Sequence, residues 1–217
     1  MTTRESGATG EQEPDDHPSH DLLEVIATVV LGVAIMLIAW NALQSSLWGG
    51  EQAKATTDAV LTSNAANDSY QLADGVKILD QLLFVEVFTS GVCDEGEAAD
   101  EEACDQILNN MSPPGLDAAS AWFDGEQFPF ESDAYSTEIY SEADALDVES
   151  NEFVVAADQA NTNADRYDTA STILATVLFF AGISLVVAWR RLRIVLLGIA
   201  SVVLLGSAVY VVTLPVV

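Results

Sequence analysis

Three apolar segments constrain the fold of this 217-residue chain more than any other feature. They run from Leu22 to Asn41, from about Thr172 to Trp189 and from Ile194 to Leu214. A helix of about 20 apolar residues crosses the hydrocarbon core of a bilayer. Pro215 follows the third segment and would end a helix there, because its nitrogen cannot donate a backbone hydrogen bond. The sequence therefore predicts an all-α membrane protein with three transmembrane helices.

A cluster of arginines sets the expected topology. Arg190, Arg191 and Arg193 fall between the second and third apolar segments. Cytoplasmic loops of membrane proteins carry an excess of Lys and Arg, so we expect the N-terminus inside and the C-terminus outside. Three tryptophans at the ends of the predicted spans are expected at the membrane interface, where amphipathic rings are enriched: Trp40, Trp48 and Trp189.

The chain divides into segments of different composition. Residues 1–21 contain almost no large apolar side chain and cannot bury enough surface to fold. The predicted segments are a disordered acidic cytoplasmic tail (1–21), transmembrane helix 1 (22–48), an external acidic helical domain (49–170) with a cap (91–140), transmembrane helix 2 (171–189), a cytoplasmic arginine turn (190–193) and transmembrane helix 3 (194–214).

The predicted external domain is strongly acidic. Residues 49–170 contain 27 Asp and Glu, against Lys54, Lys77 and Arg166 as the only basic residues. Such a surface repels itself at low ionic strength and is screened by salt, so we expect adaptation to a halophilic environment. The charge also argues against nucleic acid as a partner, because that requires a basic surface.

Two helical patterns flank the predicted cap and suggest a coiled-coil stalk. A strict seven-residue spacing keeps one stripe of a helix facing a partner helix. Before the second span, the rows are Leu146, Phe153, Ala160, Tyr167 and Leu174, and Ser150, Ala157, Ala164 and Ser171. After the first span, the corresponding residues are Leu72, Val76, Leu79 and Leu83. We therefore expect an antiparallel helical hairpin, with either a kink or a continuous helix at Gly49 and Gly50.

The cap is predicted to be irregular, because glycines and prolines such as Pro113, Pro114 and Gly115 punctuate it. Its aromatic residues are expected to pack as a small core, since a small domain needs them for stability. A ligand or partner surface is the alternative. The cap aromatics in question are Trp122, Phe123, Phe128 and Phe130.

Cys93 and Cys104 are the only cysteines, and both fall in the cap. In an oxidising external compartment this pair predicts a disulfide. The acidic residues between the two cysteines lack the spacing of an EF-hand loop, so we expect a solvated tip and no calcium site. Asn67 and Asn110 each begin an Asn-x-Ser pattern and are candidate N-glycosylation sites.

The sequence offers little material for catalysis. His17 and His20 are the only histidines, and both lie in the predicted tail, which argues against Ser-His-Asp catalysis and histidine zinc sites in the external domain. The interiors of the predicted spans contain no ionisable residue, which disfavours a pump or transporter. We therefore predict no enzyme activity, no catalytic residue, no cofactor and no metal site.

Several short segments at the membrane ends form a pattern. They are Ala39-Trp40 with Gln44, Trp48-Gly49-Gly50-Glu51-Gln52-Ala53, Thr176-Val177-Leu178-Phe179-Phe180-Ala181-Gly182-Ile183, the arginine turn and Thr213-Leu214-Pro215-Val216. The pattern resembles an uncharacterised family of prokaryotic three-span membrane proteins with an external helical stalk. The resemblance extends from Ala27 to the C-terminus and weakens across 91–112. It implies an architecture and no activity.

Together these features predict a non-enzymatic membrane protein that works through protein contacts. It would act as a homo-oligomeric scaffold or as an accessory subunit of a cell-envelope complex, with lipid, its own copies or other membrane proteins as partners. One alternative is a pore lined by Thr176, Ser184 and Ser201. Another is a sensor whose cap binds an unknown small molecule through Trp122 and Phe128.

Overall fold

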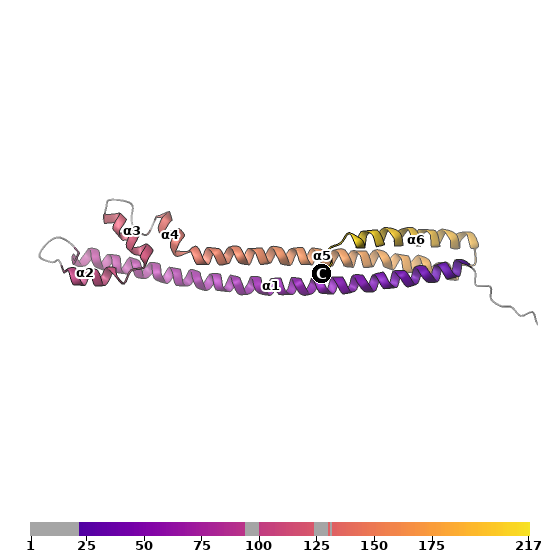
Figure 1. Ribbon diagram of the computed structural model, residues 1–217, viewed down its shortest axis with the longest axis horizontal. Helices are drawn as coiled ribbons and strands as arrows, with labels where there is room; N and C mark the ends of the chain where they lie inside the picture. The colour runs from indigo at the N-terminus through magenta and orange to yellow at the C-terminus, as the bar shows by residue number, and fades with distance from the viewer. Residues whose placement is uncertain (1–21, 94–99, 124–129, 131) are drawn as a thin grey trace, which may run out of the picture. The chain divides into compact units, whose positions relative to one another are not determined.

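The computed structural model describes residues 22–93, 100–123, 130 and 132–217. Within these ranges the chain is helical and contains no strand, which confirms the predicted all-α fold (Figure 1). The helices are α1 (Leu22–Ser90), α2 (Glu101–Leu108), α3 (Pro113–Phe123), α4 (Asp133–Ile139), α5 (Ser141–Val186) and α6 (Arg190–Val212). The predicted tail with His17 and His20 lies outside the described residues, as does Phe128.

Three of these helices are long and apolar enough to cross a membrane, as predicted: α1, α5 and α6. The helix α1 has 69 residues and α5 has 46, so both exceed the length that a bilayer requires. Gly49 and Gly50 lie inside α1, which continues through them as a helix. The two alternatives at this point are thereby decided in favour of the continuous helix.

The chain forms two compact units. Unit 1 comprises 22–44 and 166–216 among the described residues, and it contains the apolar parts of α1, α5 and α6. Its core is built from small and branched side chains of all three helices: Ala27, Val30, Ala34, Leu174, Val177, Ala181, Leu197, Ala200 and Leu204. The hydroxyl of Tyr167 donates a hydrogen bond of 3.0 Å to the carbonyl of Pro215, which ties α5 to the segment after α6.

The connection between α5 and α6 differs from the prediction. Arg190, Arg191 and Arg193 were expected to form the turn, but they lie in the first turn of α6, and the connection consists of residues 187–189. Trp189 has an extended backbone, with φ −80° and ψ 106°, and is the N-cap of α6, so this helix begins directly after it. A connection of three residues is also long enough to join two neighbouring helices.

Unit 2 comprises Ser45–Asp165. In it α1 and α5 run antiparallel, because residues later in α1 contact residues earlier in α5. The Ser150 hydroxyl donates to the carbonyl of Ala59 at 3.0 Å, and the Tyr70 hydroxyl donates to Asp144 at 2.6 Å. Side-chain hydrogen bonds therefore join the two helices at more than one level along their length.

The predicted rows of α5 lie on its inner face. Within unit 2 every member is buried or half-buried: Leu146, Ser150, Phe153, Ala157, Ala160 and Ala164. On α1 the prediction was wrong, because Leu72, Val76 and Leu79 are exposed. In unit 2 the buried row of α1 is instead Ala59, Ala66, Ala73, Asp80 and Val87, again at a spacing of seven, and Phe84 is buried beside it. The buried residues of α5 in unit 2 are also small, Ala143, Ser150 and Ala160, so the two helices pack through small residues on both sides.

The cap also differs from the irregular segment that was expected. It contains the helices α2, α3 and α4, and Pro113 and Pro114 begin α3 instead of marking a turn. Proline is favourable in the first turn of a helix, since its fixed φ suits the helix and the missing N–H has no partner there anyway. Proline in this part of the sequence therefore starts a helix.

Candidate functional site

The most unusual residue of unit 2 is Asp80, a carboxylate that is fully buried. It occupies the position on α1 that alanines occupy one and two heptads earlier, at Ala73 and Ala66. A buried charge is costly unless it is paired or receives several hydrogen bonds. The surroundings of Asp80 must therefore supply donors.

Two segments of the cap donate hydrogen bonds to Asp80. The backbone N–H of Ser112 donates to Oδ1 at 2.8 Å, and the Ser112 hydroxyl donates to Oδ2. The hydroxyl of Tyr135, on α4, donates to Oδ2 at 3.0 Å. These three bonds fasten α1 to the residue that precedes α3 and to α4.

Ser112 has a second role at the beginning of α3. Its hydroxyl oxygen accepts a hydrogen bond of 3.0 Å from the N–H of Gly115, which has no carbonyl partner within the first turn. Asp80 therefore lies beside a helix N-terminus, where the partial positive charge of the helix favours an anion. Ser112 thus stabilises the start of α3 by accepting from Gly115, and it stabilises the Asp80 carboxylate by donating to it.

Gly115 is required by the closeness of this packing. A Cβ at this position would lie 2.3 Å from Oδ2 of Asp80 and 2.4 Å from its Cγ. These distances are far below van der Waals contact, and the atoms concerned belong to a short side chain that three hydrogen bonds hold. Only glycine allows the first turn of α3 to approach the carboxylate.

The third donor, Tyr135, stays protonated. Burial, followed by the neighbouring Asp80 carboxylate and their hydrogen bond, raises the pKa of Tyr135 well above its ordinary value of 10. A neutral phenol donates to a carboxylate, whereas a phenolate beside it would repel it. The hydrogen bond to Asp80 is thus maintained over the whole physiological range of pH.

Aromatic rings surround these polar groups. Phe84 of α1 packs edge to face against Trp122 at 5.1 Å and against Phe130 at 5.6 Å between ring centroids, and Phe130 packs against Tyr135 at 5.3 Å. Phe130 is buried and Trp122 is half-buried. Of the other predicted cap aromatics, the side chain of Phe123 lies outside the described residues, as does Phe128.

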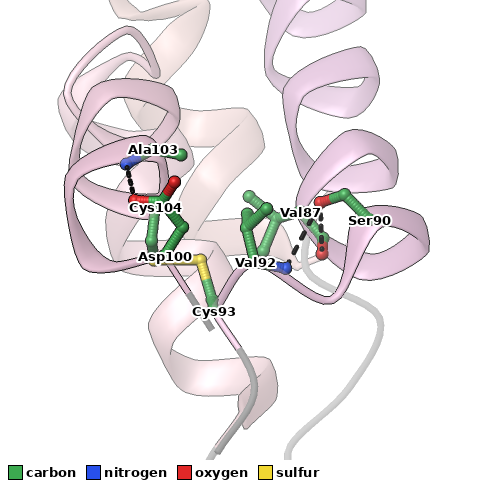
Figure 2. The surroundings of a disulfide bond; sticks show 7 residues. All are labelled: Val87, Ser90, Val92, Cys93, Asp100, Ala103 and Cys104. Atoms are coloured by element: carbon green, nitrogen blue, oxygen red, sulfur yellow. Dashed lines mark hydrogen bonds between the residues drawn. A yellow bond between two sulfur atoms is a disulfide. The ribbon is translucent and has the colours of Figure 1, made fainter. Parts of the chain in front are cut away.

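The structure brings Cys93 and Cys104 together as a disulfide with an S–S distance of 2.04 Å (Figure 2). The bond links the chain after α1 to α2. Asp100 caps α2 by accepting a hydrogen bond of 3.1 Å from the N–H of Ala103, and its own N–H donates to the carbonyl of Val92 at 2.9 Å. The disulfide and this cap together hold the start of α2 beside the end of α1.

The remaining residues singled out from the sequence lie apart from this cluster. Arg190 and Arg191 are exposed and Arg193 is half-buried; Trp40 and Trp189 are exposed and Trp48 is half-buried; Asn67 is exposed on α1, and Asn110 is exposed in the turn after α2. The amide of Asn110 donates to the carbonyl of Gln106 at 2.6 Å. The roles that the sequence suggested for these positions stay predictions.

The arrangement around Asp80 is suited to fastening the cap. Both carboxylate oxygens are engaged by donors of the same chain, and the described residues contain no group of three His, Cys, Asp or Glu that could hold a metal ion. Asp80 was not among the residues predicted from the sequence. The available signal was a charged residue that continues the seven-residue spacing of Ala59, Ala66 and Ala73.

Comparisons with protein-family models, curated proteins and solved structures found no match to this chain. The resemblance to the three-span family remains a prediction from the residues that carry it.

Proposed function

We propose that this protein is a non-enzymatic multi-pass membrane protein that presents unit 2 outside the cell and acts through protein contacts. In this role it is a homo-oligomeric scaffold or an accessory subunit of a cell-envelope complex. The observation that carries the proposal is the length of α1 and α5, which have 69 and 46 residues, whereas about 20 suffice to cross a bilayer. The surplus length builds the helical pair of unit 2, which we interpret as an antiparallel coiled-coil stalk.

The distribution of charge supports the proposed orientation. Arg190, Arg191 and Arg193 follow the second apolar span, while acidic residues predominate in unit 2. The positive-inside rule then places the arginines in the cytoplasm and unit 2 outside. An external location also agrees with the disulfide between Cys93 and Cys104, since disulfides persist in oxidising compartments.

The contacts within the cap support a structural role over a ligand site. Trp122, which the sensor alternative assigns to ligand binding, packs against Phe84 and Phe88. The Asp80 carboxylate is engaged by Ser112 and Tyr135. These groups hold the cap on the helical pair, as a rigid platform for protein contacts requires.

The hydroxyl groups of the membrane helices give the pore alternative no support. Thr176 donates to the carbonyl of Ile173, Ser184 to that of Ala181 and Ser201 to that of Leu197. Such bonds satisfy a hydroxyl within its own helix. A polar path through the membrane would instead need these groups to face a common aqueous lumen.

The proposal is tested by the native mass and composition of the tagged full-length protein, gently extracted from its own membrane at native salt. A species containing several copies of this chain alone supports the scaffold, and stoichiometric partner proteins support the accessory subunit. A single copy without partners contradicts both forms of the proposal. Ion conductance by the purified protein in planar bilayers would favour the pore.

A further inference from the structure

The described part of unit 1 is basic, although the chain as a whole is strongly acidic. The full sequence contains 34 acidic and 7 basic residues. The ionisable side chains of 22–44 and 166–216 are those of Arg166, Arg190, Arg191 and Arg193, with Glu24 and Asp168 as the carboxylates. Three of these arginines, at 190, 191 and 193, lie at the start of α6, and we call them the arginine cluster. A basic patch in such an acidic protein indicates an anionic partner.

The arginine cluster receives little compensation from the described chain. Arg190 and Arg191 are exposed, and neither forms a hydrogen bond or an ion pair with another described residue. Asp168 lies 18 residues before the end of α5 at Val186, which corresponds to about 27 Å along the helix. Glu24, at the start of α1, supplies a single negative charge. The cluster therefore needs a counter-ion from outside the described residues.

The start of α6 provides further donors for an anion. Its N-cap, Trp189, makes no side-chain cap, and the N–H of Arg193 donates to the Trp189 carbonyl at 3.0 Å. The three N–H groups before that of Arg193 have no acceptor within the helix. Arg190 and Arg193 are three residues apart, so their side chains leave the same side of α6. These donors together suit phosphate, which guanidinium binds through two parallel hydrogen bonds.

The cluster also lies where a membrane presents phosphate. It follows the apolar part of α5 after a connection of three residues and begins α6, and both helices are long and apolar enough to cross a membrane. In an inserted protein the arginines are therefore at the level of the lipid headgroups. Trp189 is 79% exposed beside them, and tryptophan is enriched at this level of a bilayer. Basic residues next to a span are attracted to anionic lipids on the cytoplasmic side.

We propose that the arginine cluster binds the phosphate group of an anionic phospholipid and thereby anchors the α5–α6 connection at the membrane surface. The inference rests on the membrane insertion that the proposed function assumes, but not on the scaffold role. The competing anions are the carboxylates of residues 1–21, such as Asp15 and Asp16. Lipid phosphates are the stronger candidates, because they are already at the depth of the cluster and in large excess over these carboxylates.

Native mass spectrometry of the full-length protein in detergent measures the preference directly. The protein is titrated with phosphatidylglycerol or phosphatidylcholine of identical acyl chains, and the lipids bound to each copy are counted. Both lipids contain a phosphate, but only phosphatidylglycerol carries a net negative charge. Each basic residue near an anionic membrane surface contributes a factor of roughly five, so phosphatidylglycerol should bind at least that much better than phosphatidylcholine.

The double variant Arg190→Gln and Arg191→Gln tests the cluster, and Arg193 is retained so that the connection keeps a positive charge. The matched control, Lys54→Gln with Arg166→Gln, removes two positive charges from exposed positions outside the cluster. The preference should fall to within about twofold of equal binding in the cluster variant and stay unchanged in the control. Circular dichroism checks that both variants retain their helicity.

A charge-preserving variant covers the case in which the glutamine variant fails to insert. Arg190→Lys with Arg191→Lys keeps the positive charge that insertion requires, but lysine is a point charge without the two-pronged geometry of guanidinium. The preference for phosphatidylglycerol should be intermediate in this variant. An undiminished preference there would overturn the pairing of guanidinium with phosphate.

The remaining outcomes identify other occupants. Equal binding of the two lipids by the native protein, or an unchanged preference in the glutamine variant, would overturn the proposal. Binding of inorganic phosphate by the lipid-free protein, with the same dependence on Arg190 and Arg191, would identify free phosphate as the ligand instead. A preference that appears only after Asp15→Asn and Asp16→Asn would identify the N-terminal segment as the occupant.

The lipid site and the proposed function can fail separately. Several copies by native mass without a lipid preference overturn the lipid site and leave the scaffold standing. A single copy without partners that still prefers phosphatidylglycerol overturns the scaffold and leaves the lipid site.

Discussion

Replacing Asp80 with alanine should release the cap from α1. Asp80 is fully buried and accepts hydrogen bonds from the N–H and hydroxyl of Ser112 and from the hydroxyl of Tyr135. Without the carboxylate these donors have no partner in the interior, at about 1–3 kcal/mol for each group left unsatisfied. We expect a local loss of about 3–5 kcal/mol, because these costs add up over the donors that lose their acceptor.

A double-mutant cycle with Gly115 separates this contact from a general loss of packing. In the presence of Asp80, Gly115→Ala places a Cβ 2.3 Å from Oδ2, and we expect overpacking to cost about 1–3 kcal/mol. In the Asp80→Ala background the obstructing atoms are gone. There alanine should be neutral or stabilising by up to about 1 kcal/mol, because it is a better helix former than glycine. The two substitutions should therefore be strongly non-additive.

Amide hydrogen exchange of the full-length protein in lipid nanodiscs measures these local free energies. A loss of about 3–5 kcal/mol corresponds to a decrease in protection of roughly a hundredfold to a few thousandfold in α3. Unit 1 provides an internal control, and Gly50→Ala, where nothing lies within 4 Å of the added Cβ, is the control for a glycine substitution in a helix. Unchanged protection of α3 in Asp80→Ala would refute the reasoning, as would an equal cost of Gly115→Ala in both backgrounds.

Three further predictions concern unit 2. Replacing Cys93 and Cys104 with serine should cost about 3 kcal/mol on the loop-entropy model and deprotect α2 in hydrogen exchange, while α3 stays protected. The hydrogen bond to Asp144 raises the pKa of Tyr70 from 10 to about 12, so its stabilising effect is fully present below pH 10 and is lost as the pH rises towards 12. A pH titration that follows tyrosinate absorbance and helicity together should show this loss of stability. The variant Tyr70→Phe should lack the part of the pH dependence that Tyr70 contributes. After reduction, Cys93 and Cys104 should react with a membrane-impermeant maleimide on intact cells; reaction only after lysis would reverse the proposed orientation.

The membrane spans could be predicted because their signal is local and intrinsic. A run such as Leu22 to Asn41 needs no partner to be recognised as a span, since the bilayer is its solvent. The inner face of α5 could be predicted equally well, because Phe153, Ala160 and Tyr167 follow one another at intervals of seven residues. In both cases the spacing alone contains the information.

The Asp80 site could not be predicted in the same way. Asp80 lies 32 residues from Ser112 and 55 from Tyr135 along the chain. The serine, the two prolines and Gly115 indicate a capped helix start, but not which anion approaches it. A single acidic residue among 34 does not stand out by composition. Only its place in the alanine spacing of α1 distinguishes it, and the row of Leu72, Val76, Leu79 and Leu83 was predicted as the inner face instead.

The prediction chose the wrong row of α1 to face α5, and this error has a physical explanation. The sequence contains two rows that could each form a helical interface, the alanines at 59, 66 and 73 and the leucines at 72 and 79. Size favours the leucines, but the buried residues of α5 in unit 2 are small as well, namely Ala143, Ser150 and Ala160. The Ser150 hydroxyl reaches the carbonyl of Ala59 at 3.0 Å, so the two helices approach closely and small residues face each other. The leucines are then left on the surface of an otherwise acidic unit, where polar residues would serve a solvated helix equally well. Heptad spacing alone therefore does not identify the inner face of a helix, and the side chains of the opposite helix decide between two such rows.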